Sequence, residues 1–314
     1  MKLLITRCLP DKVIAAARAR FDVTWRDDPT PLPPEGLRAG LRDFDAILPT
    51  LGDLFAAKVF ADVPNPRARL LANFGVGYNH IDVTAARAAG LQVTNTPGAV
   101  TDATADIAMT LILMSARRAA EGERLVRAGR WQGWHPTQML GTQVTGKTVG
   151  IIGMGRIGQA VARRCHFGFG MTVIYHNRST LSLGLPFLRA PLTQVLEADF
   201  VILAVPASPA THHLINAETL ALMRPNSYLI NISRGDVVDE AALARALQSR
   251  QIAGAGLDVY EFEPRISPAL LSQDNVTVLP HLGTAVQEVR EAMGLMAVAN
   301  LAAFAEGRPL PNPV

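Results

Sequence analysis

The sequence predicts a two-domain α/β protein with parallel sheets, and three observations support this fold class. The length of 314 residues exceeds the usual size of one domain. Short apolar runs alternate with helical stretches along most of the chain, which is the pattern of parallel strands covered by helices. A long apolar segment after Thr101 interrupts this alternation once, so we expect the chain to cross between its domains there.

The N-terminal elements predict the smaller of the two domains. We expect strands at residues 2–6, 46–49 and 70–74, helices at 11–20 and 83–90, and a proline-rich surface loop at 29–34. Residues 103–125 are apolar nearly all round, which predicts one long helix buried between domains or subunits.

A second alternation follows the irregular segment 129–146 and predicts a doubly wound sheet. Its expected strands are residues 148–152, 172–176, 200–205, 228–232, 255–259 and 276–279. A last helix at 288–306 is expected to return to the first domain. We therefore assign residues 1–99 and 285–314 to a smaller, flavodoxin-like domain, and residues 100–284 to a doubly wound domain of the Rossmann type.

Composition argues against several classes of protein. The formal net charge is only +3 and no dense basic run occurs, so nucleic acid is not an expected partner. Cys8 and Cys165 match neither a disulfide framework nor metal-ligand spacing, and no Asp/His cluster indicates a metal site. No window reaches the ~18 apolar residues of a membrane span, and the N-terminal apolar run is too short for a signal peptide. We expect a cytoplasmic protein.

A glycine fingerprint, Gly153-Met154-Gly155-Arg156-Ile157-Gly158, lies between an expected strand and an expected helix. The first glycine permits the tight turn, the second lets a pyrophosphate approach the backbone, and the third lets the helix pack on the strand. The helix N-terminus is itself a binding site for phosphate. This context predicts dinucleotide binding, in preference to a purely structural glycine-rich turn.

The residue that follows the next expected strand bears on whether the dinucleotide is NAD(H) or NADP(H). An NAD-preferring site usually presents Asp or Glu to the ribose 2′-hydroxyl at this position, but the chain has Asn177, followed by Arg178 and Ser179. An amide, a guanidinium and a hydroxyl suit a 2′-phosphate. We predict that NADP(H) is preferred and that NAD(H) is possible; the alternative is that Arg178 is only a solvated turn residue.

Three polar residues follow later strands of the second domain and predict the chemistry. Arg234, Glu263 and His281 could supply a cation for a carboxylate and carbonyl, a carboxylate partner, and a proton donor for reduction of a 2-oxo acid. Ligands of an open α/β sheet bind beyond the carboxyl ends of its strands, so these residues can converge. Each residue alone is more often solvated or structural.

Their order and sequence context strengthen the prediction. The segments Gly75-Val76-Gly77, Gly153 to Gly158, Asn231 to Gly235, Asp258 to Pro264 and Pro280 to Gly283 together resemble the D-isomer-specific 2-hydroxyacid dehydrogenase family. Residues 131–158 are most similar to its glyoxylate/hydroxypyruvate reductase branch. The resemblance implies that Arg234 binds the substrate carboxylate and carbonyl, that His281 is the acid/base, and that Glu263 orients the imidazole.

The resemblance also implies a set of binding residues. Substrate would lie against Leu51, Gly52, Val76 and Gly77, besides Arg234 and His281. The cofactor would border the fingerprint, the Asn177 to Ser179 turn, Arg234, His281 and a further group, namely Thr104, Val205, Pro206, Ile232, Ser233, Asp258 and Gly283. Trp134 is similar to an aromatic residue that reaches a neighbouring subunit's site, and a homodimer is expected. His80 is expected to support the Gly75 to Tyr78 loop, and His212 and His213 to be surface or capping residues.

The predicted function is NADPH-dependent reduction of glyoxylate to glycolate, or of hydroxypyruvate to D-glycerate. Leu51 and the Val76 loop do not fix the pocket size, so another 2-oxo acid reductase, such as one for 2-ketogluconate, is an alternative. A dinucleotide-sensing interaction protein on the same fold is a second alternative. Consumption of NADPH with glyoxylate discriminates between the enzyme and the sensor.

Overall fold

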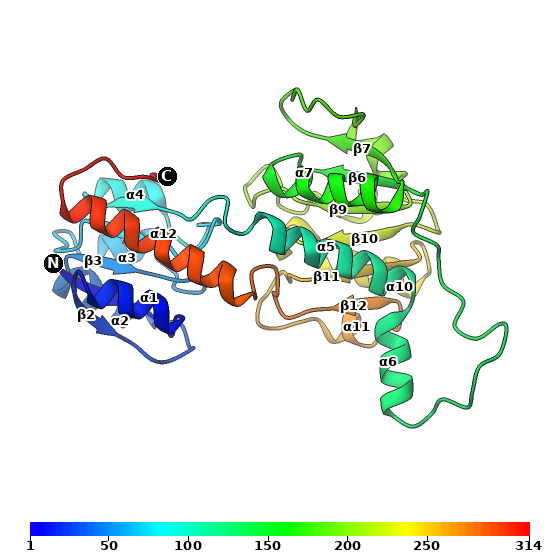
Figure 1. Cartoon of the computed structure of the whole chain (residues 1–314), viewed down its shortest axis with the longest axis horizontal. Helices are drawn as coiled ribbons and strands as arrows, with labels where there is room; N and C mark the ends of the chain where they lie inside the picture. Colours follow the sequence, from blue (N-terminus) through cyan, green and yellow to red (C-terminus); the bar gives the residue numbers. More distant parts are fainter. The chain divides into compact units, whose positions relative to one another are not determined.

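The computed structural model describes all 314 residues and divides into two compact units (Figure 1). Residues 1–100 and 284–314 form the first unit, and residues 101–283 form the second. None of the helices combines the length and the apolar character that a bilayer crossing requires.

The first unit contains a five-stranded sheet in the order β2-β1-β3-β4-β5, and every pair of neighbouring strands is parallel. This is the flavodoxin-like strand order. The strands are β1 (Lys2–Ile5), β2 (Asp22–Trp25), β3 (Ala46–Leu48), β4 (Leu70–Ala72) and β5 (Gln92–Thr94). The helices are α1 (Asp11–Arg18), α2 (Pro34–Asp43), α3 (Ala57–Ala61), α4 (Val83–Ala88) and α12 (Gln287–Ala305).

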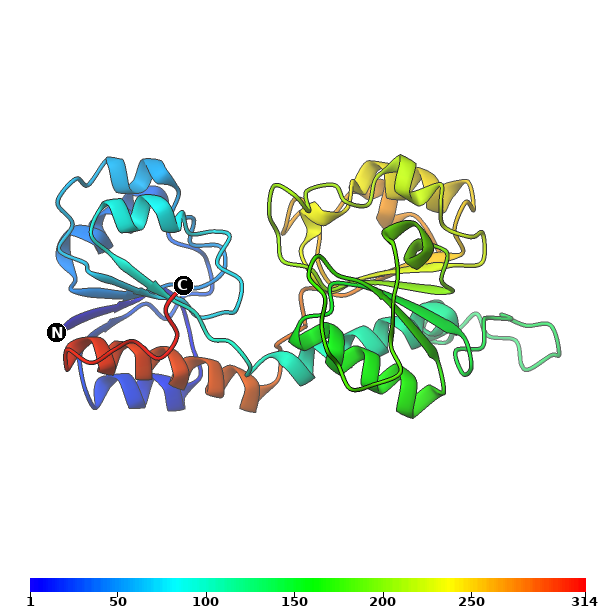
Figure 2. The same cartoon turned by 90° about the horizontal axis from the view of Figure 1, so that it is seen from above.

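Helices cover both faces of this sheet (Figure 2). On one face, α1 and α12 bury Val13, Ile14, Val298 and Leu301 against the strands. On the other face, α2, α3 and α4 bury a second apolar cluster that includes Phe55. Because α12 is needed for the first face, the unit is built from residues at both ends of the chain.

The second unit contains a seven-stranded parallel sheet in the order β12-β11-β10-β9-β6-β7-β8. The strands are β6 (Thr148–Ile152), β7 (Thr172–His176), β8 (Leu188–Arg189), β9 (Phe200–Leu203), β10 (Tyr228–Asn231), β11 (Gly254–Leu257) and β12 (Val276–Val278). Strand order reverses between β6 and β9, which is the switch point of a Rossmann sheet and the usual position of a dinucleotide. The α/β fold class with two parallel-sheet domains is confirmed.

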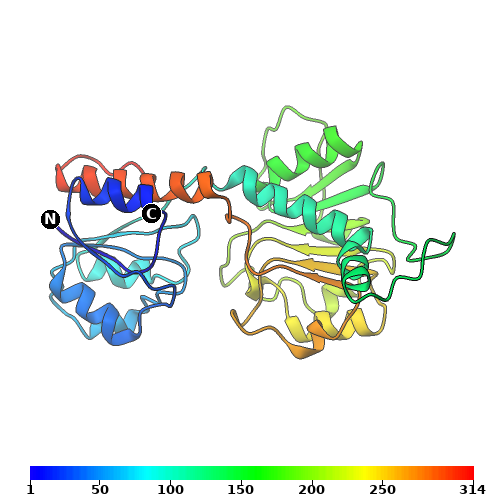
Figure 3. The same ribbon diagram turned by 60° about the horizontal axis from the view of Figure 1, so that its bottom comes forward.

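Two layers of helices enclose this sheet (Figure 3). One layer holds α5 (Thr101–Ala116), α7 (Arg156–Arg163) and its π-helical continuation η1 (Arg164–Gly168). The other holds α8 (Leu192–Leu196), α9 (Ala217–Leu220), α10 (Glu240–Gln248) and α11 (Pro268–Leu271). A 3₁₀ turn, η2 (Gly235–Val237), follows β10, and α6 (Ala119–Arg127) follows α5.

The single helix expected at residues 103–125 is wrong. The chain forms α5, which is largely buried, and then α6, in which no residue is buried. Arg118 separates them with φ of +54°, a left-handed conformation that ends an α-helix, and its guanidinium donates to the Glu121 carboxylate at 2.7 and 2.8 Å. Apolar content alone did not reveal this break.

Residues 128–147, which we call the arm, contain neither helix nor strand. The arm and α6 carry several large apolar side chains in solvent, and Trp134 is 81% exposed. The others are Val126, Trp131 and Leu140. Such a group on one segment indicates an interaction surface.

Candidate active site

The candidate residues of the second unit share one edge of its sheet. All seven strands are parallel, so the loops that follow them lie at their carboxyl ends, which we call the carboxyl edge. This edge carries Gly153 after β6, Asn177 after β7, Val205 and Pro206 after β9, Ile232 to Arg234 after β10, Asp258 after β11 and His281 after β12. The fold thus brings together the predicted cofactor residues and the predicted catalytic residues of this unit.

The glycine turn after β6 has the geometry that a dinucleotide requires. Gly153 has φ of +98°, and a Cβ there would lie 2.6 Å from the carbonyl oxygen of Ala204. A Cβ on Gly158 would lie 2.1 Å from the carbonyl oxygen of Gly153, so the helix approaches the strand as closely as the backbone permits. Nothing lies within 4 Å of a Cβ on Gly155, which leaves open space before the N-terminus of α7. These residues fit a bound pyrophosphate.

Asn177 connects this turn to the next loop. Its Oδ1 accepts the Met154 N–H at 3.1 Å, and its Nδ2 donates to the carbonyl oxygen and the hydroxyl of Ser179 at 2.9 and 3.1 Å. Arg189 of β8 braces the same loop by donating to the Asn177 carbonyl at 3.2 Å and to Thr180 Oγ1 at 3.0 Å. The side chains of Arg178 and Ser179 are exposed at the loop's tip.

His281 and Glu263 form a hydrogen-bonded pair, with Nδ1 of His281 2.9 Å from Oε2 of Glu263. Burial alone would raise the pKa of Glu263, but the hydrogen bond and charge of His281, the Tyr260 N–H and the charge of Arg234 together lower it. A carboxylate can only accept, so the proton of this bond belongs to Nδ1 of His281. Nε2 is then the nitrogen that faces a reactant, as in a general acid oriented by a carboxylate.

Asp258 holds the turn that presents His281. Its buried carboxylate accepts the N–H of Leu282 at 2.6 Å and that of Gly283 at 2.8 Å, while its carbonyl accepts the His281 N–H at 3.0 Å. Burial raises the pKa of Asp258 and these two N–H groups oppose the rise. The turn gives His281 a φ of +53°, which is uncommon for a residue with a side chain. Thr104 of α5 donates to the Gly283 carbonyl at 3.1 Å and fixes the turn from the other side.

Arg234 follows a tight turn made by Asn231. The Asn231 side chain accepts from the N–H and hydroxyl of Ser233 and donates to the Arg234 carbonyl at 2.9 Å. Burial lowers the pKa of Arg234, whereas the negative charges of Glu263 and Asp236 raise it. Arginine stays charged in proteins, so a partly buried cation is available at the carboxyl edge.

Gly235, the next residue, touches the loop that carries Glu263. A Cβ at this position would lie 1.8 Å from the carbonyl carbon of Tyr260 and 2.3 Å from the Glu261 nitrogen. The backbone that positions Arg234 therefore packs directly on the backbone that positions Glu263.

The predicted substrate residues of the first unit lie on two well-held turns. Buried Asp53 accepts from the Thr50 N–H and hydroxyl and from the Thr6 hydroxyl, and so fixes the turn that includes Leu51 and Gly52. In the second turn, Asn73 donates to the carbonyls of Gly75 and Gly77 at 3.0 Å.

Side-chain hydrogen bonds to the second turn determine where the N–H groups of Val76 and Gly77 point. Asn95 donates to the Val76 carbonyl at 2.9 Å. In a trans peptide the C=O and the following N–H point in opposite directions. Binding of the carbonyls of Gly75 and Val76 by asparagines therefore turns the N–H groups of Val76 and Gly77 the other way, as recognition of an anion by backbone amides requires.

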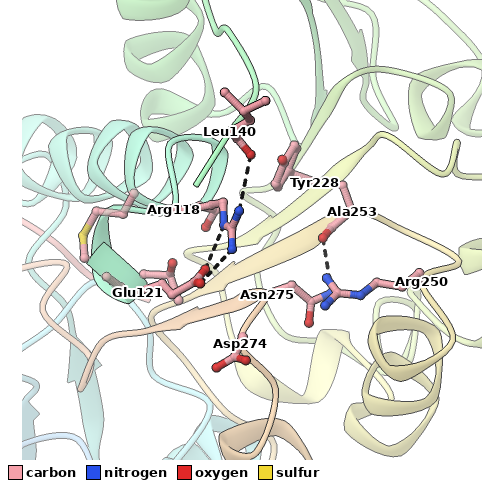
Figure 4. A pocket seen from close by; sticks show the side chains of 12 residues that line it. Arg118, Glu121, Leu140, Tyr228, Arg250, Ala253, Asp274 and Asn275 are labelled. Carbon is pink, nitrogen blue, oxygen red and sulfur yellow. Dashed lines mark hydrogen bonds and ion pairs between the residues drawn. The ribbon is translucent and has the colours of Figure 1, made fainter. Parts of the chain in front are cut away.

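A separate cavity of about 330 Å³ is not part of this site (Figure 4). Tyr228 begins β10, Ala253 precedes β11 and Asn275 precedes β12, so this cavity lies at the amino ends of the strands, opposite the carboxyl edge. Arg118 and Glu121, already paired with each other, also line it. No group of three or more His, Cys, Asp or Glu side chains in the structure is arranged to hold a metal ion.

A doubly wound parallel sheet with a G-x-G-x-x-G turn defines the dinucleotide-binding class of proteins. Comparison with known proteins narrows this class. A family model described as D-isomer specific 2-hydroxyacid dehydrogenase, NAD binding domain, matches residues 109–283. The chain is 44% identical over 321 residues to a glyoxylate reductase of Thermococcus onnurineus (strain NA1), and the alignment covers 99% of this chain and 95% of that relative. The chain therefore belongs to the D-isomer-specific 2-hydroxyacid dehydrogenase family.

Solved structures agree with this assignment. An NADPH-dependent glyoxylate/hydroxypyruvate reductase from Sinorhizobium meliloti, in complex with NADP and malonate, superimposes with a TM-score of 0.89 at 36% identity, covering 100% of this chain and 96% of that one. A glyoxylate reductase from Paecilomyes thermophila gives a TM-score of 0.88 at 33% identity, covering 100% and 98%.

Sequence reasoning missed the residues that hold the site together. Asp53, Asn73 and Asn95 bind the turns of the first unit. His213, expected to be a surface or capping residue, contacts the Glu261 carboxylate through its ring. No short motif identifies such residues, because their partners are determined by the conformation of the turns and loops and not by spacing along the chain. His80 is buried near the Gly75 to Tyr78 loop.

Proposed function

We propose that the protein reduces glyoxylate to glycolate and hydroxypyruvate to D-glycerate with NADPH. The observation that carries this proposal is the His281–Glu263 pair, which lies on the same sheet edge as the glycine turn and Arg234. The S. meliloti protein is described as an NADPH-dependent glyoxylate/hydroxypyruvate reductase and the P. thermophila protein as a glyoxylate reductase, and both resemble this chain over its whole length.

In the proposed reaction, NADPH supplies a hydride to the carbonyl carbon of the 2-oxo acid. Arg234 binds the substrate carboxylate and polarises the carbonyl oxygen. In the first unit, the N–H groups of Val76 and Gly77 are oriented so that they can bind a carboxylate. His281 donates the proton on Nε2 to the developing alkoxide, and Glu263 stabilises the imidazolium before this transfer. The product gains one hydride and one proton, and His281 recovers its proton from solvent.

Preference for NADPH over NADH is supported by the loop after β7. Asn177 lacks the carboxylate that would accept from a free 2′-hydroxyl and repel a 2′-phosphate. Arg178 and Ser179 are exposed at the tip and can donate to a phosphate. Hydrogen bonds to charged groups contribute about 1.5 to 3 kcal/mol, so one such bond corresponds to roughly 10-fold to 150-fold in affinity.

The test is a substrate panel assayed separately with NADPH and NADH. We expect glyoxylate and hydroxypyruvate to exceed 2-ketogluconate in kcat/KM, and NADPH to exceed NADH by at least about tenfold. His281→Ala should lower kcat by roughly 100-fold to 10,000-fold while NADPH still binds. Arg178→Ala should weaken the binding of NADPH and leave the binding of NADH nearly unchanged. Asn177→Asp should also weaken NADPH binding, because the new carboxylate repels the 2′-phosphate.

Each part of the proposal has its own contrary result. Turnover of 2-ketogluconate alone would refute the assignment of glyoxylate and hydroxypyruvate as substrates. Binding of NADPH without turnover of any 2-oxo acid would favour a dinucleotide-sensing protein. Equal kcat/KM values with NADPH and NADH would show that the loop after β7 does not contact the 2′-phosphate.

The proposed enzyme is a homodimer formed through α6 and the arm. The exposed side chains of Val126, Trp131, Trp134 and Leu140 support this surface. Light scattering should give twice the chain mass for the wild type, and a double change of Trp131 and Trp134 to Ser should shift it towards the monomer. A monomeric wild type at micromolar concentration would refute the dimer.

A further inference from the structure

His213 lies in one loop of the carboxyl edge and contacts two others. It lies in the segment that follows β9, the segment that also carries Val205 and Pro206. Its backbone N–H donates to the carbonyl of Asp236 at 2.8 Å, two residues beyond Arg234. Its ring nitrogen Nε2 lies 2.7 Å from Oε1 of Glu261, two residues before Glu263.

The backbone of His213 is held in an unusual conformation. Its φ is +47°, a left-handed value shared by only four other non-glycine residues of the chain, one of which is His281. Such a conformation persists only where surrounding contacts determine it. Here they include the Asp236 and Glu261 bonds and a bond from Asn216 Nδ2 to the His213 carbonyl at 3.2 Å.

Glu261 is also bound by Glu240, because the backbone N–H of each residue donates to the carboxylate of the other. The Glu240 N–H donates to Oε2 of Glu261 at 3.3 Å, and the Glu261 N–H donates to Oε2 of Glu240 at 3.2 Å. Oε1 of Glu240 accepts the Ser267 N–H at 2.8 Å, so Glu240 binds both ends of the loop from 261 to 267. Glu240 is almost fully buried at the start of α10, which makes it a rigid base.

The loop that carries Glu263 is therefore clamped at a second point, two residues before the carboxylate that contacts His281. Glu261 faces His213 and Glu240, while Glu263 faces His281. Between the two carboxylates the loop exposes Phe262, which cannot hold it in place. If the clamp is removed, the contacts that remain around Glu263 include the Tyr260 N–H bond to its carboxylate, the Gly235 contact and the bond from the Arg265 N–H to the Phe262 carbonyl at 2.9 Å, none of which holds residue 261 itself on α10 or on the loop after β9.

We propose that His213, Glu261 and Glu240 are positioning residues that hold the Glu263 carboxylate on Nδ1 of His281. This inference rests on the proposed function, because it concerns the acid/base pair of that reaction. The effect falls on kcat rather than on KM, since the orientation of the imidazole matters when the proton is transferred, whereas Arg234 binds the substrate in either case.

The test compares His213→Ala and Glu261→Gln with a matched control, His212→Ala. His212 stacks on His213 but does not bond to Glu261, so it controls for the loss of an imidazole in this segment. Both clamp variants should lower kcat for glyoxylate by about 10-fold to 100-fold, the cost of misplacing a catalytic group by up to about 1 Å. KM and NADPH affinity should change by no more than about threefold, and the control should match the wild type.

A second readout does not depend on turnover. In protein labelled with ¹⁵N-histidine, the downfield proton of His281 Nδ1–H, assigned by its absence in His281→Gln, reports the bond to Glu263. We expect exchange with water to broaden it in the clamp variants and not in the control. If His213→Ala melts below the assay temperature, His213→Asn replaces it, because asparagine tolerates positive φ.

The outcomes separate this inference from the proposed function. A wild type that reduces no 2-oxo acid defeats the proposed reaction, whereas the proton signal still tests the clamp. An unchanged signal and kcat in folded His213→Ala and Glu261→Gln variants would overturn the clamp and leave the proposed reaction intact. Loss of kcat with an unchanged signal would also overturn it.

Discussion

Replacement of Gly235 by alanine is the most direct perturbation of the contact between the two catalytic loops. The added Cβ would lie 1.8 Å from the Tyr260 carbonyl carbon and 1.9 Å from its oxygen, whereas ordinary contact begins at 3.4 Å. The loops must separate by the difference, 3.4 minus 1.8, or 1.6 Å. Both obstructing groups are backbone, so no side-chain rotation can relieve the clash.

The expected loss follows from this displacement. A shift of about 1 Å in a catalytic group costs roughly 100-fold in rate, so we expect kcat/KM for glyoxylate to fall by at least about 100-fold. Overpacking of this kind also destabilises by about 1 to 3 kcal/mol, which the folded enzyme should survive. NADPH should bind nearly as well, because the glycine turn after β6 is not touched.

The assay is steady-state reduction of glyoxylate, with thermal melting and NADPH fluorescence as checks on folding and binding. Gly168→Ala is the matched control, since a Cβ at that position would meet nothing within 4 Å. It should retain full activity. A folded Gly235→Ala enzyme with the kcat/KM of the wild type would show that the Arg234 and Glu263 loops do not depend on this contact.

Three further predictions concern single groups. Arg234→Lys should raise KM for glyoxylate and lower kcat, because an ammonium lacks the two-pronged geometry of guanidinium, and near-normal kinetics would remove Arg234 from the site. Glu263→Gln should lower kcat for glyoxylate while KM changes little, because it removes the carboxylate that accepts the Nδ1 proton of His281 and orients the ring, and a kcat equal to that of the wild type would contradict this. Burial raises the pKa of Cys165 to about 12 while Cys8 is exposed, so iodoacetamide at pH 8 should label one thiol in the native protein and two in urea; two labels in the native protein would contradict it.

Much of the fold is predictable because its local signals agree. The expected strands of the second unit match β6, β7, β9, β10, β11 and β12 to within two residues, since each is a short apolar run bounded by turn residues. The break between α5 and α6 was not predictable from apolar content, because it depends on a left-handed Arg118 and its bond to Glu121. β2 and β5 were also not anticipated, because neither is a fully buried apolar run: β2 is half-exposed, and β5 begins with the exposed Gln92.

Some residues of the candidate site could also be proposed from the sequence, and others could not. Arg234, Glu263 and His281 could be proposed from the sequence, because each follows a strand and parallel strands share an edge. The contacts of His213 could not, because they depend on where a loop after β9 meets one after β11. Asp258 was expected beside the cofactor, yet both of its carboxylate oxygens accept backbone N–H groups of the His281 turn. Spacing along the chain gives no information on such pairings.

The composition of the first unit from both ends of the chain has a consequence for biosynthesis. During translation, residues 1–100 emerge first but lack α12, whose Ala297, Val298 and Leu301 complete the apolar layer over β1, β3 and β4. The second unit is continuous from Thr101 to Gly283 and has its whole sequence before α12 leaves the ribosome. The N-terminal segment therefore waits with one face of its sheet covered by α1 alone while the later unit folds, and the apolar strands that α12 will cover are open to aggregation during that interval.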